Sequence, residues 1–357
     1  MAETHVGERG VRLLSIDGGG IRGLSALFIL QNLMWRIRMS DDLDHTPRPC
    51  EYFDLIGGTN TGGLIALMLG RLRMSVEEAI NYWGKFSVKV FGDTKGFGIR
   101  DGKYRASNFE DILRSIVKDH TEPHNPEAGM TEKGAAACKT FVCAMNADNM
   151  NASIPVLFRT YYNPTEVPIE CKIWEAGRAT CAMPILFKRI EIGPQYMKQS
   201  YIDGGWGRNN PAKIVLEEAR IMFPARKIEC LISIGTGYPK TIALTPATSQ
   251  QSGSVDSVGK TLMALATDCE QTAQELSQEY RHTPDVYFRF NVQRGMEQVS
   301  PEQWDRLSEV RAHTEQYLKD VDVSPRVDKA VMVLRKGGLN LNTSTRPKLD
   351  FVFFLFW

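Results

Sequence analysis

The chain has 357 residues, and its 43% hydrophobic and 24% charged residues are the proportions of an ordinary globular protein. This balance excludes a largely disordered or fibrous chain. Lys and Arg number 43 against 42 Asp and Glu, so the net charge of +1 gives no electrostatic reason to expect nucleic-acid binding. The length suggests one large domain or two small ones.

The seven cysteines are odd in number and include no Cys-x-x-Cys pair, which argues against a disulfide framework or a zinc site and favours a reducing compartment. Residues 1–10 form a polar tail without the apolar core of a signal peptide, and no segment reaches the ~20 apolar residues that span a bilayer. We therefore expect a cytoplasmic protein with peripheral contact at membrane surfaces. The apolar tail at 346–357 is too short to cross a membrane; a shallow membrane contact, a buried terminal strand and a truncated or misassembled reading frame all remain open.

Two strand–glycine loop–helix units open the chain. The first comprises the apolar strand Val11–Ile16 and the helix Gly23–Arg38. The second comprises the strand Tyr52–Ile56 and the helix Leu64–Leu69. Each unit has a glycine-rich connection, which predicts a tight turn at the end of its strand.

Strands and helices continue to alternate along the chain. Ser75 and Glu78 have the spacing of a capping box and predict a helix that runs through Trp83. We expect further strands at Lys139–Met145, Val156–Tyr162 and Ile228–Ile234. Further helices are expected at Ile173–Ala182 and Pro211–Phe223. This alternation predicts an α/β fold in which helices cover both faces of a mostly parallel sheet.

The C-terminal third is less regular. The polar stretches 118–133 and 241–260 are expected to be surface insertions. Alternation over Val286–Val292 predicts a half-buried strand, and Ser300 is expected to open a helix that carries Leu307. The expected organisation is one domain over 11–345, with a core at 11–237 and a continuation at 261–340.

The first glycine loop allows more than one interpretation. Gly18, Gly20 and Gly23 satisfy the G-x-G-x-x-G pattern of dinucleotide binding, but no acidic residue closes a second strand at the required distance. Asp17 also places a carboxylate where a pyrophosphate would dock, and the ending of a P-loop is missing. Free backbone N–H groups beside a helix N-terminus suit a developing oxyanion equally well, and a simple tight turn remains open.

The second glycine loop and a later motif point to acyl-transfer chemistry. Gly58 to Gly62 has the frame of the nucleophile elbow G-x-S-x-G, in which a sharp turn presents the central side chain, but the central residue is Asn60. Asp203 is followed by Gly204 and Gly205, and these glycines permit another backbone to approach the carboxylate closely.

In combination these motifs resemble the patatin-like phospholipases, a family of lipid acyl hydrolases with a Ser-Asp dyad. The resemblance covers residues 11–237, including further blocks at 177–184 and 233–237, and residues 285–318 are similar to the continuation in fungal members. It implies a three-layer α/β/α fold with a mostly parallel sheet. It assigns the nucleophile position to Asn60 and the proton acceptor to Asp203. The oxyanion hole is assigned to Gly18, Gly19, Gly20 and Arg22, and the elbow and base motifs to Gly58, Gly62, Gly204 and Gly205.

The same resemblance implies hydrolysis of glycerolipid or phospholipid acyl esters at a transient membrane or lipid-droplet surface, without a metal ion or cofactor. Asn60 lacks the hydroxyl that the dyad needs, because the lone pair of an amide nitrogen is delocalised into its carbonyl. We therefore expect strongly impaired hydrolysis on a scaffold that still binds lipid, with the Asn60 amide donating a hydrogen bond to Asp203.

Several alternatives remain open. The hydroxyl of Thr59 or Thr61 would serve an active enzyme, and a regulatory or interaction module without catalysis is a further possibility. A Ser-His-Asp arrangement would need His282 or His313, both of which are expected to be solvated. Trp206 is a candidate floor for an acyl groove or an ordinary core residue.

Arg22 also has more than one interpretation. It is suited to steering an anionic head group, to shaping the oxyanion loop or to forming an ordinary ion pair.

Overall fold

The computed structural model describes residues 9–95, 102–132, 134, 138–150, 154–242 and 254–336. Within these residues one sheet of eight strands has the order β5-β6-β3-β2-β1-β7-β8, with β4 paired to β3. The strands are β1 Val11–Ile16, β2 Leu55–Thr59, β3 Lys139–Asn146, β4 Val156–Arg159, β5 Ile190–Ile192, β6 Gln199–Asp203, β7 Ile228–Ile234 and β8 Tyr287–Phe290. The pairs β3–β2, β2–β1, β1–β7 and β7–β8 are parallel, and the pairs β3–β4, β3–β6 and β5–β6 are antiparallel.

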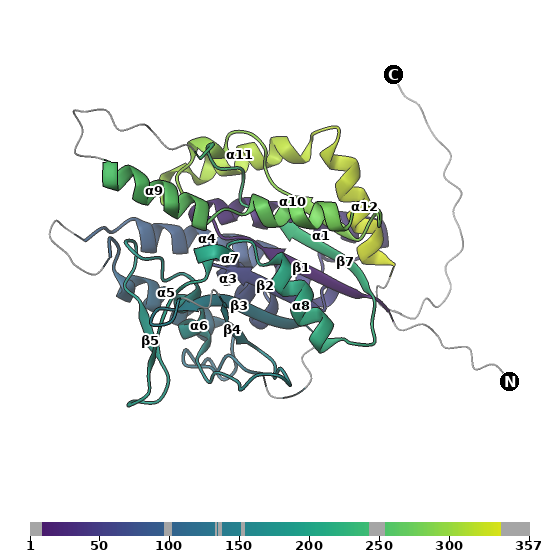
Figure 1. The fold of residues 1–357 in the computed structure, drawn as a ribbon. Helices are drawn as coiled ribbons and strands as arrows, with labels where there is room; N and C mark the ends of the chain where they lie inside the picture. The colour runs from purple at the N-terminus through teal and green to yellow at the C-terminus, as the bar shows by residue number, and fades with distance from the viewer. Residues whose placement is uncertain are drawn as a thin grey trace, which may run out of the picture.

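Helices enclose the sheet on both faces (Figure 1). They are α1 Gly23–Asp41, α2 Pro49–Tyr52, α3 Thr61–Ala66, α4 Val76–Phe91, α5 Ala106–Asp119, α6 Ile173–Thr180, α7 Gly205–Arg208, α8 Ala212–Met222, α9 Ser254–Ala266, α10 Glu270–Glu279, α11 Leu307–Leu318 and α12 Val323–Arg335. The predicted α/β architecture with three layers and a mostly parallel sheet is confirmed.

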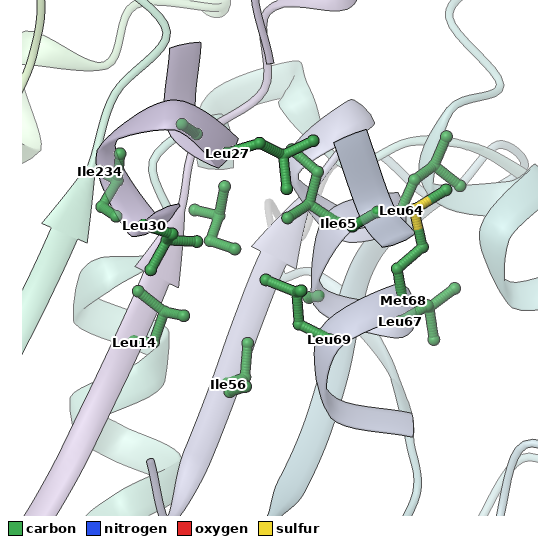
Figure 2. Packing of buried hydrophobic residues seen from close by; sticks show 14 of the residues in the cluster. Leu14, Leu27, Leu30, Ile56, Leu64, Ile65, Leu67, Met68, Leu69 and Ile234 are labelled. Atoms are coloured by element: carbon green, nitrogen blue, oxygen red, sulfur yellow. The ribbon is translucent and has the colours of Figure 1, made fainter. Parts of the chain in front are cut away.

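Two hydrophobic clusters lie on the opposite faces of the sheet. Leu14 and Ile56 belong to the larger cluster. Leu30 of α1 lies close to Leu14, and Leu69, in the turn that follows α3, lies close to Ile56 (Figure 2). The alternate strand residues pack against α8 in the smaller cluster. Every residue of β1 is therefore buried, as expected for a central parallel strand.

Two predicted boundaries near the first units are wrong. The second strand begins at Leu55 rather than Tyr52, because Pro49 occupies the first turn of the short helix α2. The following helix, α3, begins at Thr61 and continues into a π-helical turn over Leu67–Arg71. The capping box at Ser75 and Glu78 is confirmed, with both reciprocal hydrogen bonds present.

The C-terminal third differs more from the prediction. The helix expected to open at Ser300 begins at Leu307, because the Ser300 N–H donates to the side chain of Gln303 at 2.7 Å and closes a separate turn. Helix α9 begins inside the stretch predicted to be a surface insertion, and the antiparallel pair β5–β6 was not anticipated. Residues 1–8 and 337–357, which hold most of the polar tail and all of the apolar tail, lie outside the described residues.

The strand register brings the functional loops to one edge of the sheet. Ile16 pairs with Gly58 on one side and with Ile234 on the other, so the chain leaves β1, β2 and β7 at the same level. Asp203 pairs with Ala144 of β3, next to the position that pairs with the last residue of β2. Residues 60 and 203 consequently meet although 143 positions separate them.

No helix in the described part of the chain is both long and apolar enough to cross a membrane.

Candidate active site

The turn between β2 and α3 has a strained backbone. Asn60 has φ 54° and ψ −131°, which places a non-glycine residue in the left-handed half of conformational space. The Asn60 N–H donates to Oγ1 of Thr180 at 3.0 Å, and its side-chain oxygen accepts from the Thr61 N–H. These contacts hold the side chain of Asn60 at the start of α3, as an elbow requires.

Glycine is required on both sides of Asn60. A Cβ on Gly62 would lie 2.4 Å from the carbonyl oxygens of Ile16 and Asp17, and a Cβ on Gly58 would lie 2.2 Å from that of Gly62. The start of α3 therefore packs backbone to backbone against the end of β1.

Asp203 ends β6 directly behind the elbow and is fully buried. Its Oδ2 accepts a hydrogen bond from Nδ2 of Asn60, and its Oδ1 accepts from the Gly205 N–H at 2.6 Å. Burial raises the pKa of Asp203 to about 7, against the opposing effect of these two hydrogen bonds. A Cβ on Gly204 would lie 2.4 Å from the Cys143 carbonyl oxygen, so glycine permits this close approach to β3. The two dyad positions meet as predicted, with an amide where a dyad has a hydroxyl.

Four hydrogen bonds fix the peptide groups of Gly18 and Gly19 in the loop after β1. The Gly18 N–H donates to the carbonyl of Asn209 at 3.1 Å, and the hydroxyl of Thr236 donates to the Gly18 carbonyl at 3.0 Å. The Gly19 N–H donates to Oγ1 of Thr61 at 3.3 Å, and Nε of Arg22 donates to the Gly19 carbonyl at 3.4 Å. The orientation of both peptide groups is thus set before any ligand binds.

These bonds narrow the predicted set of oxyanion donors. The Gly18 N–H already donates to the Asn209 carbonyl, so it does not face a ligand as predicted for all three glycine amides. The long bond from Gly19 is easily exchanged, and the Gly20 N–H has no acceptor among the described residues. Arg22 lines the cavity and braces the loop, and burial lowers the pKa of its guanidinium.

A buried ion pair anchors the same loop from behind, and the sequence did not reveal it. Asp17 is contacted at 2.6 Å by Nη2 of Arg289 from β8, which also lies 2.9 Å from Glu270 and donates from Nη1 to Ser233. Burial raises the pKa of Asp17 to about 6, and Arg289 limits the rise. The only available signal was a cation between Phe288 and Phe290 in a strand that was predicted to be half-buried.

The loop after β7 joins this network. Asn291 donates from its side-chain nitrogen to Glu270 at 2.8 Å and accepts from the Gly237 N–H at 2.6 Å. The block 233–237 therefore contacts the glycine loop through Thr236, and Asn291 holds Gly237 at the end of the block.

A cavity of about 570 Å³ opens beside Asn60 and the glycine loop. Its far wall is apolar, with Phe86 and Phe109 in edge-on contact at 5.1 Å between ring centroids and Phe187 at 5.2 Å from Phe109. These rings come from α4, α5 and the segment before β5, which is why sequence reasoning missed them. Its size and lining suit an apolar chain with a polar group at the Asn60 end.

The other candidates separate clearly. The hydroxyl of Thr59 is buried and donates to the Arg208 carbonyl at 2.9 Å, whereas Thr61 lines the cavity. Trp206, His282 and His313 are not among the residues that line the cavity in the described part of the chain. Within the same residues, no group of three or more His, Cys, Asp or Glu is placed to hold a metal ion.

The sequence model of the family described as patatin-like phospholipase matches residues 14–216, more than half of the chain. The chain belongs to this family. Human calcium-independent phospholipase A2-gamma is 28% identical over 309 residues, which cover 79% of this chain and 35% of that relative. Phospholipase A I of Arabidopsis thaliana is 26% identical over 393 residues, which cover 92% of this chain and 28% of that relative.

A third relative, probable inactive patatin-like protein 9 of Arabidopsis thaliana, is 26% identical over 254 residues, covering 67% of this patatin-like chain and 63% of the relative. The chain thus spans only about a third of the length of the two phospholipases. Its scaffold is that of a lipid acyl hydrolase family.

Proposed function

We propose that this patatin-like chain binds the acyl chains of glycerolipids or phospholipids, and that Asn60 at its elbow strongly impairs hydrolysis. The observation that carries the proposal is the hydrogen bond from Nδ2 of Asn60 to Oδ2 of Asp203. It occupies the path along which a nucleophilic hydroxyl would give up its proton. The fungal-type assignment of residues 285–318, a cytoplasmic location and access to membrane or lipid-droplet surfaces belong to the same proposal.

Ester hydrolysis at this site needs three groups. A hydroxyl attacks the carbonyl, a carboxylate takes its proton, and N–H groups stabilise the tetrahedral oxyanion. Asp203 is a competent base because its pKa lies near 7, and Gly19 and Gly20 supply amides beside the elbow. The amide of Asn60 offers no lone pair for attack, so the first step has no nucleophile.

The cavity supports the substrate class. The ester carbonyl would lie at the polar end, near Asn60 and Gly19, while the acyl chain would lie along the wall formed by Phe86, Phe109 and Phe187. Two relatives are named as phospholipases, which favours a phospholipid among the acyl esters.

The test compares the parent with Asn60→Ser and Asn60→Ala, by measuring fatty acid released from phosphatidylcholine vesicles and from a short-chain soluble ester. We expect background turnover in the parent and in Asn60→Ala, and at least ~10³-fold more in Asn60→Ser. Comparable turnover by the parent and Asn60→Ser would reject the impaired-enzyme proposal. Binding of a soluble fluorescent fatty acid by the parent tests lipid binding separately, and its absence would favour an interaction module.

Thr61 keeps the active-enzyme alternative open, because its hydroxyl lines the cavity 3.3 Å from the Gly19 amide. A fluorophosphonate adduct mapped to Thr61 in the parent, lost in Thr61→Val, would support it. The buried hydrogen bond of Thr59 to the Arg208 carbonyl argues against that second hydroxyl.

A further inference from the structure

A second cavity, of about 730 Å³, is lined by residues of α5, α6 and β5 and of the segment before β5. These elements lie at the lower left of the view in Figure 1. Ile185 and Phe187 line both this second cavity and the first cavity, beside Asn60, so the two cavities are neighbours. None of the described lining residues of the second cavity comes from the elbow or the glycine loop, which sets it apart from the candidate active site.

Arg178 of α6 is the buried cation of the second cavity. It lines the cavity, and only 1% of its side chain is exposed. Its Nη2 donates to the Lys188 carbonyl, but Nε and Nη1 have no hydrogen-bond partner among the described residues. A carboxylate oxygen of Glu110 lies 3.7 Å from Nε, which is too long for a hydrogen bond. The one N–H of Nε and the two of Nη1 are therefore unused, although buried donors are almost always paired.

The surroundings of Arg178 leave its charge only partly compensated. The buried Arg289 has carboxylate oxygens at 2.6 Å and 2.9 Å. The guanidinium carbon of Arg178 instead lies 5.7 Å and 5.6 Å from the ring centroids of Phe109 and Phe187. These rings stabilise a cation but offer no oxygen to its N–H groups. Burial lowers the pKa of Arg178, yet a guanidinium stays charged at neutral pH, so the site favours an anion.

The other charges around the second cavity add to this preference. The charged side chains that line it are the cations Arg178, Lys188 and Arg189 and the carboxylates Glu110 and Glu191. Among the described lining residues the cations thus exceed the carboxylates by one. Lys188 and Arg189 are exposed, and Arg189 lies 3.5 Å from the exposed carboxylate of Asp148, a pair of the kind that contributes little. Both cations therefore remain available to a ligand that carries negative charge.

We propose that the second cavity binds a phosphate group through the unused N–H groups of Arg178, with Lys188 and Arg189 contributing positive charge. A phosphate suits the site better than a carboxylate, because it offers more acceptor oxygens and more charge to three cationic side chains. The phosphate belongs either to a soluble phosphate ester or to a lipid head group, which share this chemistry. The proposal goes beyond the proposed function, because it needs no acyl chain in the first cavity.

The test titrates the full chain with inorganic phosphate by isothermal titration calorimetry at constant ionic strength. We expect saturable binding by the parent, and about ten-fold or more weaker binding by Arg178→Gln, because charge-assisted hydrogen bonds are lost. Lys188→Gln/Arg189→Gln changes only exposed side chains and should lower the affinity about three-fold. Lys198→Gln is the matched control, since this exposed lysine precedes β6 in the same hairpin but does not line the cavity, and its affinity should equal that of the parent.

Three results would overturn the proposal. The first is a parent that shows no saturable binding of inorganic phosphate. The second is an Arg178→Gln variant that unfolds at the parent's temperature and binds phosphate like the parent. If Arg178→Gln does not fold, the variant with two exposed substitutions takes its place, and parent-like affinity of Lys188→Gln/Arg189→Gln is the third.

A soluble short-chain phosphatidic acid distinguishes the two sources of the phosphate. We expect it to bind the parent more tightly than Arg178→Gln, as inorganic phosphate does. Loss of this binding when a free fatty acid saturates the first cavity would assign the phosphate to a lipid head group, and unchanged binding would assign it to a soluble ester. A parent that binds inorganic phosphate but no fatty acid would support the second cavity while the proposed function fails.

Discussion

Two buried aspartates lie at the same edge of the sheet, and their surroundings give them different roles. Asp17 faces the guanidinium of Arg289 at 2.6 Å, and its pKa is raised only to about 6. Asp203 has an amide and a backbone N–H as partners, no cation contributes to its pKa, and burial raises that pKa to about 7. The carboxylate with a cation is an anchor for the glycine loop, and the carboxylate without one is able to take up a proton near neutrality.

The largest effect should come from removing the base. In the Asn60→Ser background, we expect Asp203→Asn to lower ester turnover by about 10³-fold or more, because no other group takes the proton. Asp17→Asn in the same background should lower turnover much less, since Asp17 acts only through the glycine loop. Equal losses in two folded variants, measured with a soluble ester, would contradict the division of roles.

Removing the cation should act on stability. We expect Arg289→Met to lower the free energy of unfolding by about 3–5 kcal/mol, because it leaves Asp17 buried without its ion-pair partner. Arg289→Lys should cost less, since it keeps the charge. Urea unfolding measures both, with Asn60→Ser as the control for a change at the other carboxylate. A loss below about 1 kcal/mol in Arg289→Met would show that the pair does not anchor the loop.

The pH dependence should have opposite signs for stability and activity. The folded-state pKa values of both aspartates lie above the ordinary 3.8. Each protonated group therefore contributes its full stabilisation below pH 3.8, and this contribution is lost as the pH rises through about 6 for Asp17 and about 7 for Asp203. The free energy of unfolding should therefore fall over this range, by up to about 1.4 kcal/mol per pH unit for each group. Asp203→Asn should remove its part of the slope.

Turnover by Asn60→Ser should instead rise as the pH passes the pKa of Asp203, which burial raises to about 7 in the parent, because the base must be ionised. A pH-independent rate between pH 5 and 8 would contradict this assignment of Asp203.

The smallest effect concerns the elbow itself. Thr180→Val keeps the side-chain volume but removes the acceptor of the Asn60 N–H, which is held at 3.0 Å. We expect a loss of about 1 kcal/mol in the free energy of unfolding, the cost of a backbone donor left unpaired. Thr165→Val, at an exposed turn, is a control that should change stability less.

Much of the scaffold could be predicted from local patterns. The strand Ile228–Ile234 was placed at its observed bounds, and the capping box at Ser75 set the start of α4. Long apolar runs and caps are local signals, so they survive without tertiary information. The helix α9 was missed because its first turns follow a Ser- and Gly-rich stretch that is typical of a loop.

The site was only partly predictable for a related reason. The elbow and base motifs are short and local, so Asn60 and Asp203 could be named, and their contact then followed from the pairing of β6 with β3. Arg289 could not be assigned, because alternation along β8 predicts a solvent-facing side chain. Helices on both faces of the sheet bury that position instead.

The sequence by itself determined the strand–turn–helix units, the glycines that permit the elbow, and the amide at its centre, because each depends on a few consecutive residues. Only the tertiary structure decided which carboxylate has a cation and which rings form the cavity wall. These depend on distant segments packing together, and such packing leaves no local pattern in the chain.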